Sequence, residues 1–232
     1  MTLLMFSGQI AAQQPMSQTQ LANTVSEAIT LFHQTKRKEW AFNVFDYENE
    51  EGDIRQSTER FDPSNAPNKQ WTLLTINGGQ TPTEKQRQAY LKEKNKPKSD
   101  EDNRFKLKLN DLIQLNSLTL IENKKDYFNA SFAVNLKQMS EKANESLTGL
   151  LTYNKKEGYI SQIEITNKDI FSPVLTAKID AFNLLFTFIK LGDAILPSEK
   201  HLTMHGTFAF FTEIDEVSTT KFSNYVHLGL KE

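Results

Sequence analysis

Histidines are the residues of this chain with the widest chemical repertoire, and two of the four are close in sequence. His201 and His205 have the spacing that places two imidazoles on one face of a zinc-binding helix, but they lie in a segment of alternating apolar residues. In a strand, four residues span about 13 Å, which is too far for a shared metal ion. We therefore predict no metal site. An acid–base set of His205 with Asp215 and Glu216 remains the basis of one alternative function, a hydrolase.

Other motifs of catalysis are missing from the sequence. Ser172 and Ser223 have no G-x-S-x-G context, and the chain contains no cysteine. Gly78 and Gly79 are followed by Gln80 and do not form a phosphate-binding loop. The sequence therefore predicts a protein that is not an enzyme, with no catalytic residues and no cofactor.

The composition points to a globular protein with an aromatic interior. Hydrophobic residues make up 38% of the 232 residues, and the formal net charge is -2. Nucleic acid binding needs an excess of Lys and Arg, so we predict no nucleic acid partner. Phe is far more frequent than Tyr or Trp (16 against 6 and 2) and has no polar group. Such a surplus of Phe indicates a packed core or a dry cavity.

The elements that must position these residues are mainly strands. Alternating apolar and polar residues run from Tyr127 to Leu228. Segments 147–153 and 159–166 predict a hairpin, since the loop between them has a Gly near its end. Residues 174–191 favour a strand, although Phe and Leu residues at helical spacing leave a helix open. A bulge or bend is expected at Gly206.

The N-terminal half adds helices to this sheet. Apolar residues at helical spacing predict an amphipathic helix over 17–38. Three strands are expected at 40–47, 54–61 and 71–76. A second helix should start with Thr81 as its N-cap and Pro82 as its first residue, and should reach about Leu91. The mixed charges of residues 92–104 indicate a mobile loop, and residues 107–120 fit either helix or strand.

The first twelve residues resemble the end of a secretory signal peptide. A short apolar run from Thr2 to Gly8 is followed by residues 9–12, which end in two alanines, and then by polar Gln13. The basic segment that should precede such a run is missing, so a loosely held N-terminus is the alternative. We predict export to the periplasm of a Gram-negative bacterium, with residues 1–12 as a signal-peptide remnant and 13–232 as one domain. No other segment approaches the roughly 20 apolar residues of a transmembrane helix.

The Phe residues of the predicted sheet form one apolar face. Phe132, Phe182, Phe186, Phe208 and Phe210 would share this face. It is larger than two helices can obviously cover, and surplus apolar surface is buried by another element, a partner or a ligand. An ordinary filled core is the alternative for each Phe.

The order of these elements resembles the periplasmic lipoprotein-carrier fold (LolA/LolB-like). The similarity extends from about Ser17 to Leu228: a leading amphipathic helix, strands, a short helix and a continuous antiparallel series. The segment from Phe61 to Thr83 also looks like a pattern in uncharacterised bacterial exported proteins. The resemblance implies an incomplete β-barrel around an acyl-chain cavity. It implies that the ligand-binding residues are Phe132, Val134, Phe182, Leu184, Phe186, Phe208 and Phe210, with Val25, Ile29 and Phe32 as a lid.

The sequence thus predicts an α+β fold, in which a single curved antiparallel sheet (an incomplete β-barrel) wraps around the N-terminal helix and a second short helix. The predicted function is non-catalytic binding or carriage of an apolar ligand, an acyl chain or a lipidated protein, in the bacterial envelope. One alternative is an envelope protein–protein interaction module with a filled core, which would offer a strand edge or the surroundings of Trp40 and Trp71 to an unknown partner.

Overall fold

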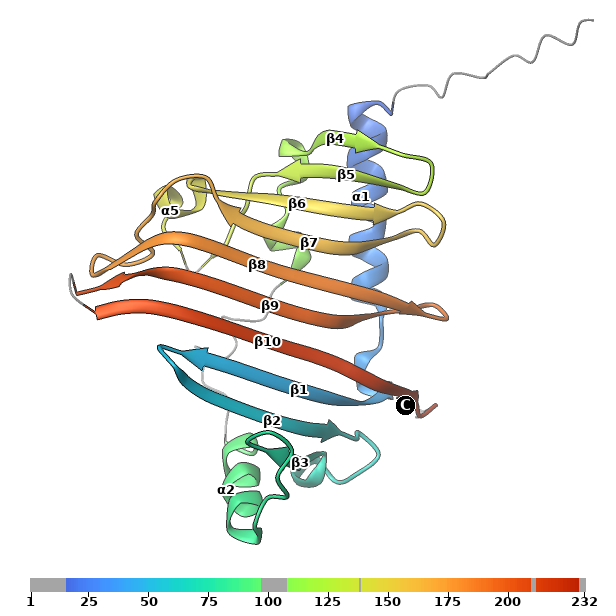
Figure 1. Ribbon diagram of the computed structural model, residues 1–232. Helices are drawn as coiled ribbons and strands as arrows, with labels where there is room; N and C mark the ends of the chain where they lie inside the picture. The colour runs from blue at the N-terminus through green and yellow to red at the C-terminus, as the bar shows by residue number, and fades with distance from the viewer. Residues whose placement is uncertain (1–15, 97–107, 138, 210–211, 230–232) are drawn as a thin grey trace, which may run out of the picture.

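A single open antiparallel sheet dominates the computed structural model, which describes residues 16–96, 108–137, 139–209 and 212–229. Its ten strands follow the order β3-β2-β1-β10-β9-β8-β7-β6-β5-β4 (Figure 1). The strands are β1 Trp40–Glu50, β2 Asp53–Phe61, β3 Trp71–Ile76, β4 Thr119–Asn123, β5 Tyr127–Phe132, β6 Leu147–Asn154, β7 Tyr159–Asn167, β8 Ala177–Leu191, β9 Ala194–Phe208 and β10 Thr212–His227. The expected α+β fold, an unclosed antiparallel sheet with the N-terminal helix against it, is confirmed. The predicted signal remnant at 1–12 lies outside the described residues.

The strand order places the first strands of the chain next to the last one. β4 to β10 form a meander in which each strand pairs with the next. β10 then pairs with β1, so the first three strands extend the sheet beyond the last one. The hairpin predicted from 147–153 and 159–166 is confirmed as β6 and β7.

Helix α1 (Gln18–Gln34) covers one face of the β4–β9 half, which we call the inner face; the opposite face is the outer face (Figure 1). A capping box between Ser17 and Gln20 starts the helix. It ends at Gln34, earlier than the predicted Lys38, because Thr35 turns to an extended conformation. The Thr35 hydroxyl accepts a hydrogen bond of 2.9 Å from the backbone N–H of Ile195. Residues Arg37–Glu39 then form a short 3₁₀ turn, η1.

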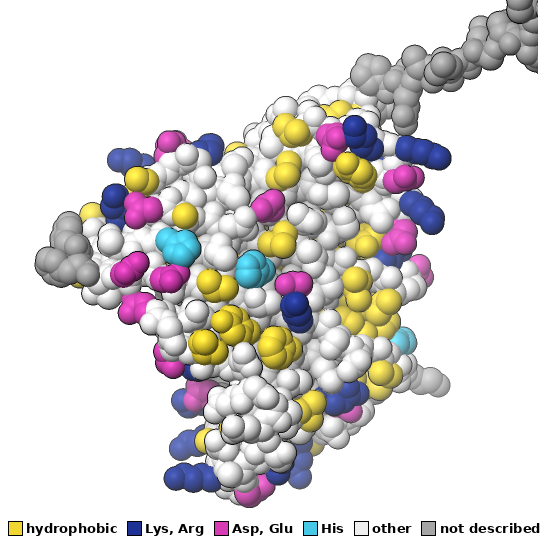
Figure 2. Space-filling model, in the orientation of Figure 1, with side chains coloured by type: hydrophobic (Ala, Val, Ile, Leu, Met, Phe, Trp, Pro, Cys, Tyr) yellow, Lys and Arg dark blue, Asp and Glu magenta, His cyan; other side chains and the backbone are white. Residues whose placement is uncertain are grey.

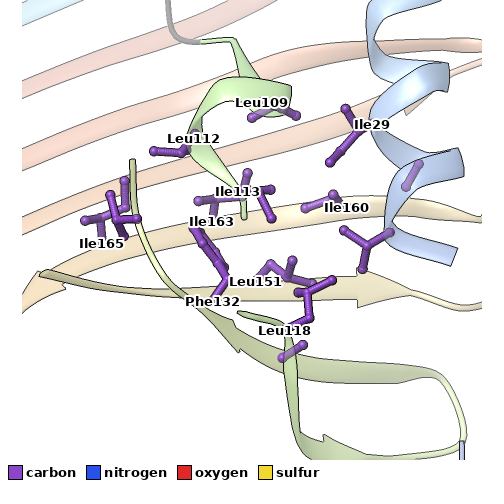
Figure 3. Packing of buried hydrophobic residues seen from close by; sticks show 14 of the residues in the cluster. Ile29, Leu109, Leu112, Ile113, Leu118, Phe132, Leu151, Ile160, Ile163 and Ile165 are labelled. Atoms are coloured by element: carbon purple, nitrogen blue, oxygen red, sulfur yellow. The ribbon is translucent and has the colours of Figure 1, made fainter. Parts of the chain in front are cut away.

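The segment at 107–120, whose pattern fitted either helix or strand, packs into the core. We call its residues 108–118 the plug. The segment folds as a short helix, α4 (Leu109–Leu112), a 3₁₀ turn, η3 (Leu115–Ser117), and then β4. Leu109, Leu112 and Ile113 are fully buried. Figure 3 shows Leu109, Leu112 and Ile113 between Ile29 of α1 and the strand residues on which they pack. The core is therefore sealed from two sides, by α1 and by the plug.

Helix α2 (Glu84–Lys94) differs from its prediction at both ends. Its N-cap is Thr83, not Thr81, and the capping box joins Thr83 to Gln86. The predicted placement of Pro82 as first helical residue is therefore wrong, and Pro82 precedes the cap. Residues 92–94, expected in a charged loop, continue the helix, while 97–104 lie outside the described residues. The remaining short elements are η2 (Pro67–Lys69) and α5 (Glu141–Glu145).

The segment predicted at 174–191 forms a strand from Ala177 to Leu191, so the helical alternative is wrong. β8 pairs with β9 along most of its length, and Phe182 lies opposite Met204. The irregularity expected near Gly206 is present, as a register shift between Ile179 and Ala181 on the facing strand. A Cβ at Gly206 would lie 2.2 Å from the carbonyl oxygen of Lys178, so only glycine allows this close approach.

Candidate functional site

The predicted ligand-binding residues divide into a core group and an open group. Val25, Ile29, Phe32, Phe132, Val134 and Phe182 are buried, and all six belong to one packed cluster. Leu184 and Phe186 are partly buried at the margin of this cluster. Phe208 is 47% exposed at the end of β9, and Phe210 lies outside the described residues. Val134 also lines a polar pocket, whereas Phe32 and Phe186 border one larger open space.

That space is a groove of about 860 Å³ beside the C-terminal end of α1. Its floor is formed by the inner face of β8, β9 and β10, and its walls by the last turn of α1, by η1 and by the start of α4. The volume lies within the range of ~300–1,000 Å³ that is usual for small-molecule sites. The apolar side chains that line it are Phe32, Leu109, Phe186, Phe188, Pro197 and Phe222.

Sequence reasoning missed four of these six residues. Phe188 shares the alternation of Phe186 and could have been found from it. Phe222 comes from a distant strand, and Leu109 from the ambiguous segment. Their convergence depends on the strand order and on the plug, which no local pattern reveals.

Contacts between rings fix the shape of the groove. The rings of Phe32 and Phe188 meet edge to face, with centroids 5.1 Å apart. The guanidinium carbon of Arg37 lies 4.1 Å from the centroid of Phe32, so a cation sits on the same aromatic wall. On the other side, the Tyr225 hydroxyl donates a 2.6 Å hydrogen bond to the carbonyl of Pro197. In the wall of the groove, the cationic side chain of Arg37 is thus in direct contact with the apolar rings.

Basic residues outnumber acidic ones around this groove. Its acidic residues, Glu39 and Glu199, already have partners: Glu39 lies 3.2 Å from His227 and 3.5 Å from Lys36, and Glu199 lies 4.0 Å from Lys221. The basic residues in its lining are Lys36, Arg37, Lys38, Lys108 and Lys200. A site of this kind favours an apolar ligand that carries negative charge.

Arg37 is the basic residue in closest contact with the apolar wall. Arg37 as a whole residue is exposed, but its guanidinium stacks on Phe32, and this partial loss of water lowers its pKa, which the phenol of Tyr225 partly offsets. Among the residues that the structure describes, no carboxylate forms an ion pair with Arg37. The surroundings therefore leave this cation less well solvated than a free arginine, without a fixed counter-charge.

Phe222 connects the groove to a second group of rings on the β10–β3 half of the inner face. The ring cluster consists of Trp40, Phe42, Phe61, Trp71, Phe222 and Tyr225, with neighbouring centroids 5.0–6.2 Å apart. All six side chains are partly exposed. The apolar floor of the groove therefore continues onto the half of the sheet that α1 leaves uncovered.

His201 and His205 of β9 alternate onto the outer face, where Figure 2 shows histidine side chains, whereas His33 lines the groove. His205 Nδ1 is 3.0 Å from Asp215, and both side chains are about half exposed. His201 Nδ1 is 2.8 Å from the Thr219 hydroxyl. Glu216, the other member of the predicted acid–base set, follows Asp215 in the strand and points to the inner face. No group of three potential metal ligands occurs within the described ranges.

Comparisons with known proteins add a distant structural likeness. No family model matches the chain, and no curated protein sequence matches it. A solved structure, a DUF1329 family protein from Desulfovibrio piger ATCC 29098, is similar over 90% of this chain and 95% of that chain, with 8% sequence identity and a TM-score of 0.35. A likeness of this level carries no functional assignment. No helix in the described part of the chain has the length and apolar character needed to cross a membrane.

Proposed function

We propose that this protein binds an acyl chain, free or attached to a lipidated protein, in the groove beside α1. The observation that carries the proposal is the convergence of four Phe rings, Leu109 and Pro197 on one open space. Each CH₂ group that moves from water into such a space contributes about 0.8 kcal/mol. The binding is non-catalytic and needs no covalent step.

The envelope is the proposed setting. The apolar run at the N-terminus supports export, and the periplasmic lipoprotein carriers, which the chain resembles in element order, would provide the closest functional parallel. In this proposal the sealed core beneath α1 is structural, and the open groove is the part that takes the ligand. This differs from a cavity formed by the whole aromatic face.

An uncharged fluorescent probe tests the proposal directly. N-phenyl-1-naphthylamine should bind saturably to the full chain, with increased emission as it leaves water. Phe186→Ser removes a ring from the groove and should weaken binding by about tenfold. Phe45→Ser is the matched control, because Phe45 is 37% exposed and alternates onto the outer face.

Native mass spectrometry with lipid extraction complements this titration. A lipid that copurifies with the wild type and the Phe45→Ser variant, but not with Phe186→Ser, would support the proposal. It would be rejected if the probe did not bind, or if both variants bound it equally well while remaining folded.

A further inference from the structure

We infer that the groove selects a single-chain phospholipid with net negative charge, and that Arg37 and Lys200 hold its head group. The inference rests on the proposed acyl-chain binding and adds the class of ligand. It starts from the charge around the groove, where five basic residues face two acidic ones although the whole chain has a net charge of -2. The excess of positive charge is therefore local.

Existing ion pairs do not explain this excess. Glu39 and Glu199, the acidic residues of the lining, have their own partners in Lys36, Lys221 and the imidazole of His227. Within the described ranges, no ion pair or hydrogen bond joins the charged groups of Arg37 or Lys200 to a carboxylate. An anionic ligand would thus meet cations that need not first leave a protein partner.

Arg37 determines where the anion should lie relative to the chain. Its guanidinium stacks on Phe32, which in turn contacts Phe188 on the floor. A ligand that touches both groups must have its anion next to its apolar part, as an amphiphile does. The planar guanidinium also binds two oxygens of a phosphate in parallel, which a lysine cannot do.

Lys200 supplies a second cation from the opposite side of the groove. In the sheet it lies directly opposite Phe186, so its side chain is on the inner face beside an apolar floor residue. Arg37, by contrast, belongs to η1 after the end of α1. A head group between these two elements would be held from the helix side and from the sheet side. The groove volume of about 860 Å³ suits one acyl chain with its head group.

Two lysophospholipids that differ only in head group test the inference. Palmitoyl lysophosphatidylglycerol is anionic, and palmitoyl lysophosphatidylcholine is zwitterionic. Each competes with N-phenyl-1-naphthylamine below the concentration at which it forms micelles. We expect the anionic lipid to displace the probe at about tenfold lower concentration, because hydrogen bonds to charged groups have that strength. Added salt should reduce this preference.

Variants assign the preference to residues. Arg37→Gln and, independently, Lys200→Gln should each reduce the preference to about threefold or less, whereas Arg37→Lys should retain more of it than Arg37→Gln. Lys178→Gln is the control, because Lys178 lies at the other end of β8 and pairs with Asp180. Glycerol phosphate, which has no acyl chain, should not displace the probe.

The outcomes separate the two proposals. Equal displacement by both lipids, with normal probe binding, would overturn the head-group inference and leave acyl-chain binding in place. Failure of the probe itself to bind would reject the proposed function. A preference that persists in both glutamine variants would show that Arg37 and Lys200 do not hold the head group.

Discussion

The ammonium nitrogen of Lys94 lies 2.7 Å from Oε2 of Glu59. Glu59 is 7% exposed and is the one buried charged residue among those that the structure describes. The ion pair joins α2 to β2, and the same ammonium group lies 4.4 Å from the centroid of Trp71. Lys94 thus neutralises a buried carboxylate and covers an edge ring. Helix α2 has no fully buried residue, and this ion pair is one of the contacts that hold it to the sheet.

Loss of Lys94 should therefore weaken the attachment of α2 to the sheet. Lys94→Ala leaves the carboxylate of Glu59 without its counter-charge and should lower the free energy of unfolding by about 1–3 kcal/mol. Lys92→Ala, an exposed lysine of the same helix, is the control and should change it by less than about 0.5 kcal/mol. Urea unfolding monitored by Trp fluorescence measures both. Equal effects would show that the ion pair contributes no stability.

Tyr90 of α2 should tolerate removal of its hydroxyl. The hydroxyl is buried beside the carboxylate of Glu59, but within the described part of the chain it forms no hydrogen bond of good geometry. Tyr90→Phe should therefore be neutral or stabilising by up to about 1 kcal/mol at neutral pH. Tyr225→Phe provides the contrast, because it removes the donor to Pro197 and should cost about 1 kcal/mol. A larger loss in Tyr90→Phe would indicate a partner for its hydroxyl.

The same variant should respond less to alkaline pH. Burial, and then the charge of Glu59, raise the pKa of Tyr90 in the folded protein. An unfolded chain releases the phenol proton near pH 10, so the stability linked to the neutral phenol is complete below about pH 10 and declines above it. Tyr90→Phe should lose less free energy of unfolding than wild type between about pH 9 and 11. Parallel curves would contradict the raised pKa.

Gly206 should not accept even a methyl group. Its missing Cβ would lie 2.2 Å from a backbone oxygen of β8, so the strands would have to separate. Gly206→Ala should lower the free energy of unfolding by about 2–3 kcal/mol. Thr207→Ala, the next residue in the strand, is the control and should cost less than about 1 kcal/mol. Thermal unfolding followed by circular dichroism compares them, and equal midpoints would show that the sheet adapts.

Sequence patterns predicted the sheet because its signals are local. Alternation and turn residues identify hairpins such as β6–β7, whose partners are adjacent in the chain. The pairing of β1 with β10 joins residues more than 160 positions apart, and no local pattern specifies it. The N-cap of α2 was misplaced for a different reason. Thr81 and Thr83 each stand three residues before a possible capping partner, Glu84 and Gln86, so the local pattern fits both, and the structure uses Thr83.

The candidate site was harder to predict because periodicity identifies a face and not what covers it. Phe132 and Phe186 alternate onto the same inner face, yet Phe132 is sealed by the plug and Phe186 borders the groove. The segment that contains Leu109 decides the difference, and its pattern fitted both helix and strand. The charges did not predict the basic side of the groove either, since Lys36, Arg37 and Lys38 are the kind of residues expected at the end of any helix.

The contact between Glu39 and His227 should make the wall of the groove sensitive to acid. The hydrogen bond from His227 and, more weakly, the charge of Lys36 lower the pKa of Glu39 in the folded protein. A carboxylate with a lowered folded pKa contributes stability above its unfolded pKa of about 4.3, and this contribution is lost as the pH falls through the lower folded value. Wild type should therefore lose more stability below about pH 5 than a variant without the contact.

His227→Ala tests this pH dependence, and Glu39→Gln removes the same contact without touching the histidine. In His227→Ala, carbon-detected NMR should show the pKa of Glu39 moving up toward its ordinary value. The free energies of unfolding of both variants should differ from wild type at pH 6 and converge with it near pH 3. His227 also packs on Trp40, with ring centroids 4.9 Å apart. A deficit in His227→Ala that persists unchanged at pH 3, while Glu39→Gln shows none, would assign the effect to ring packing and not to the ion pair.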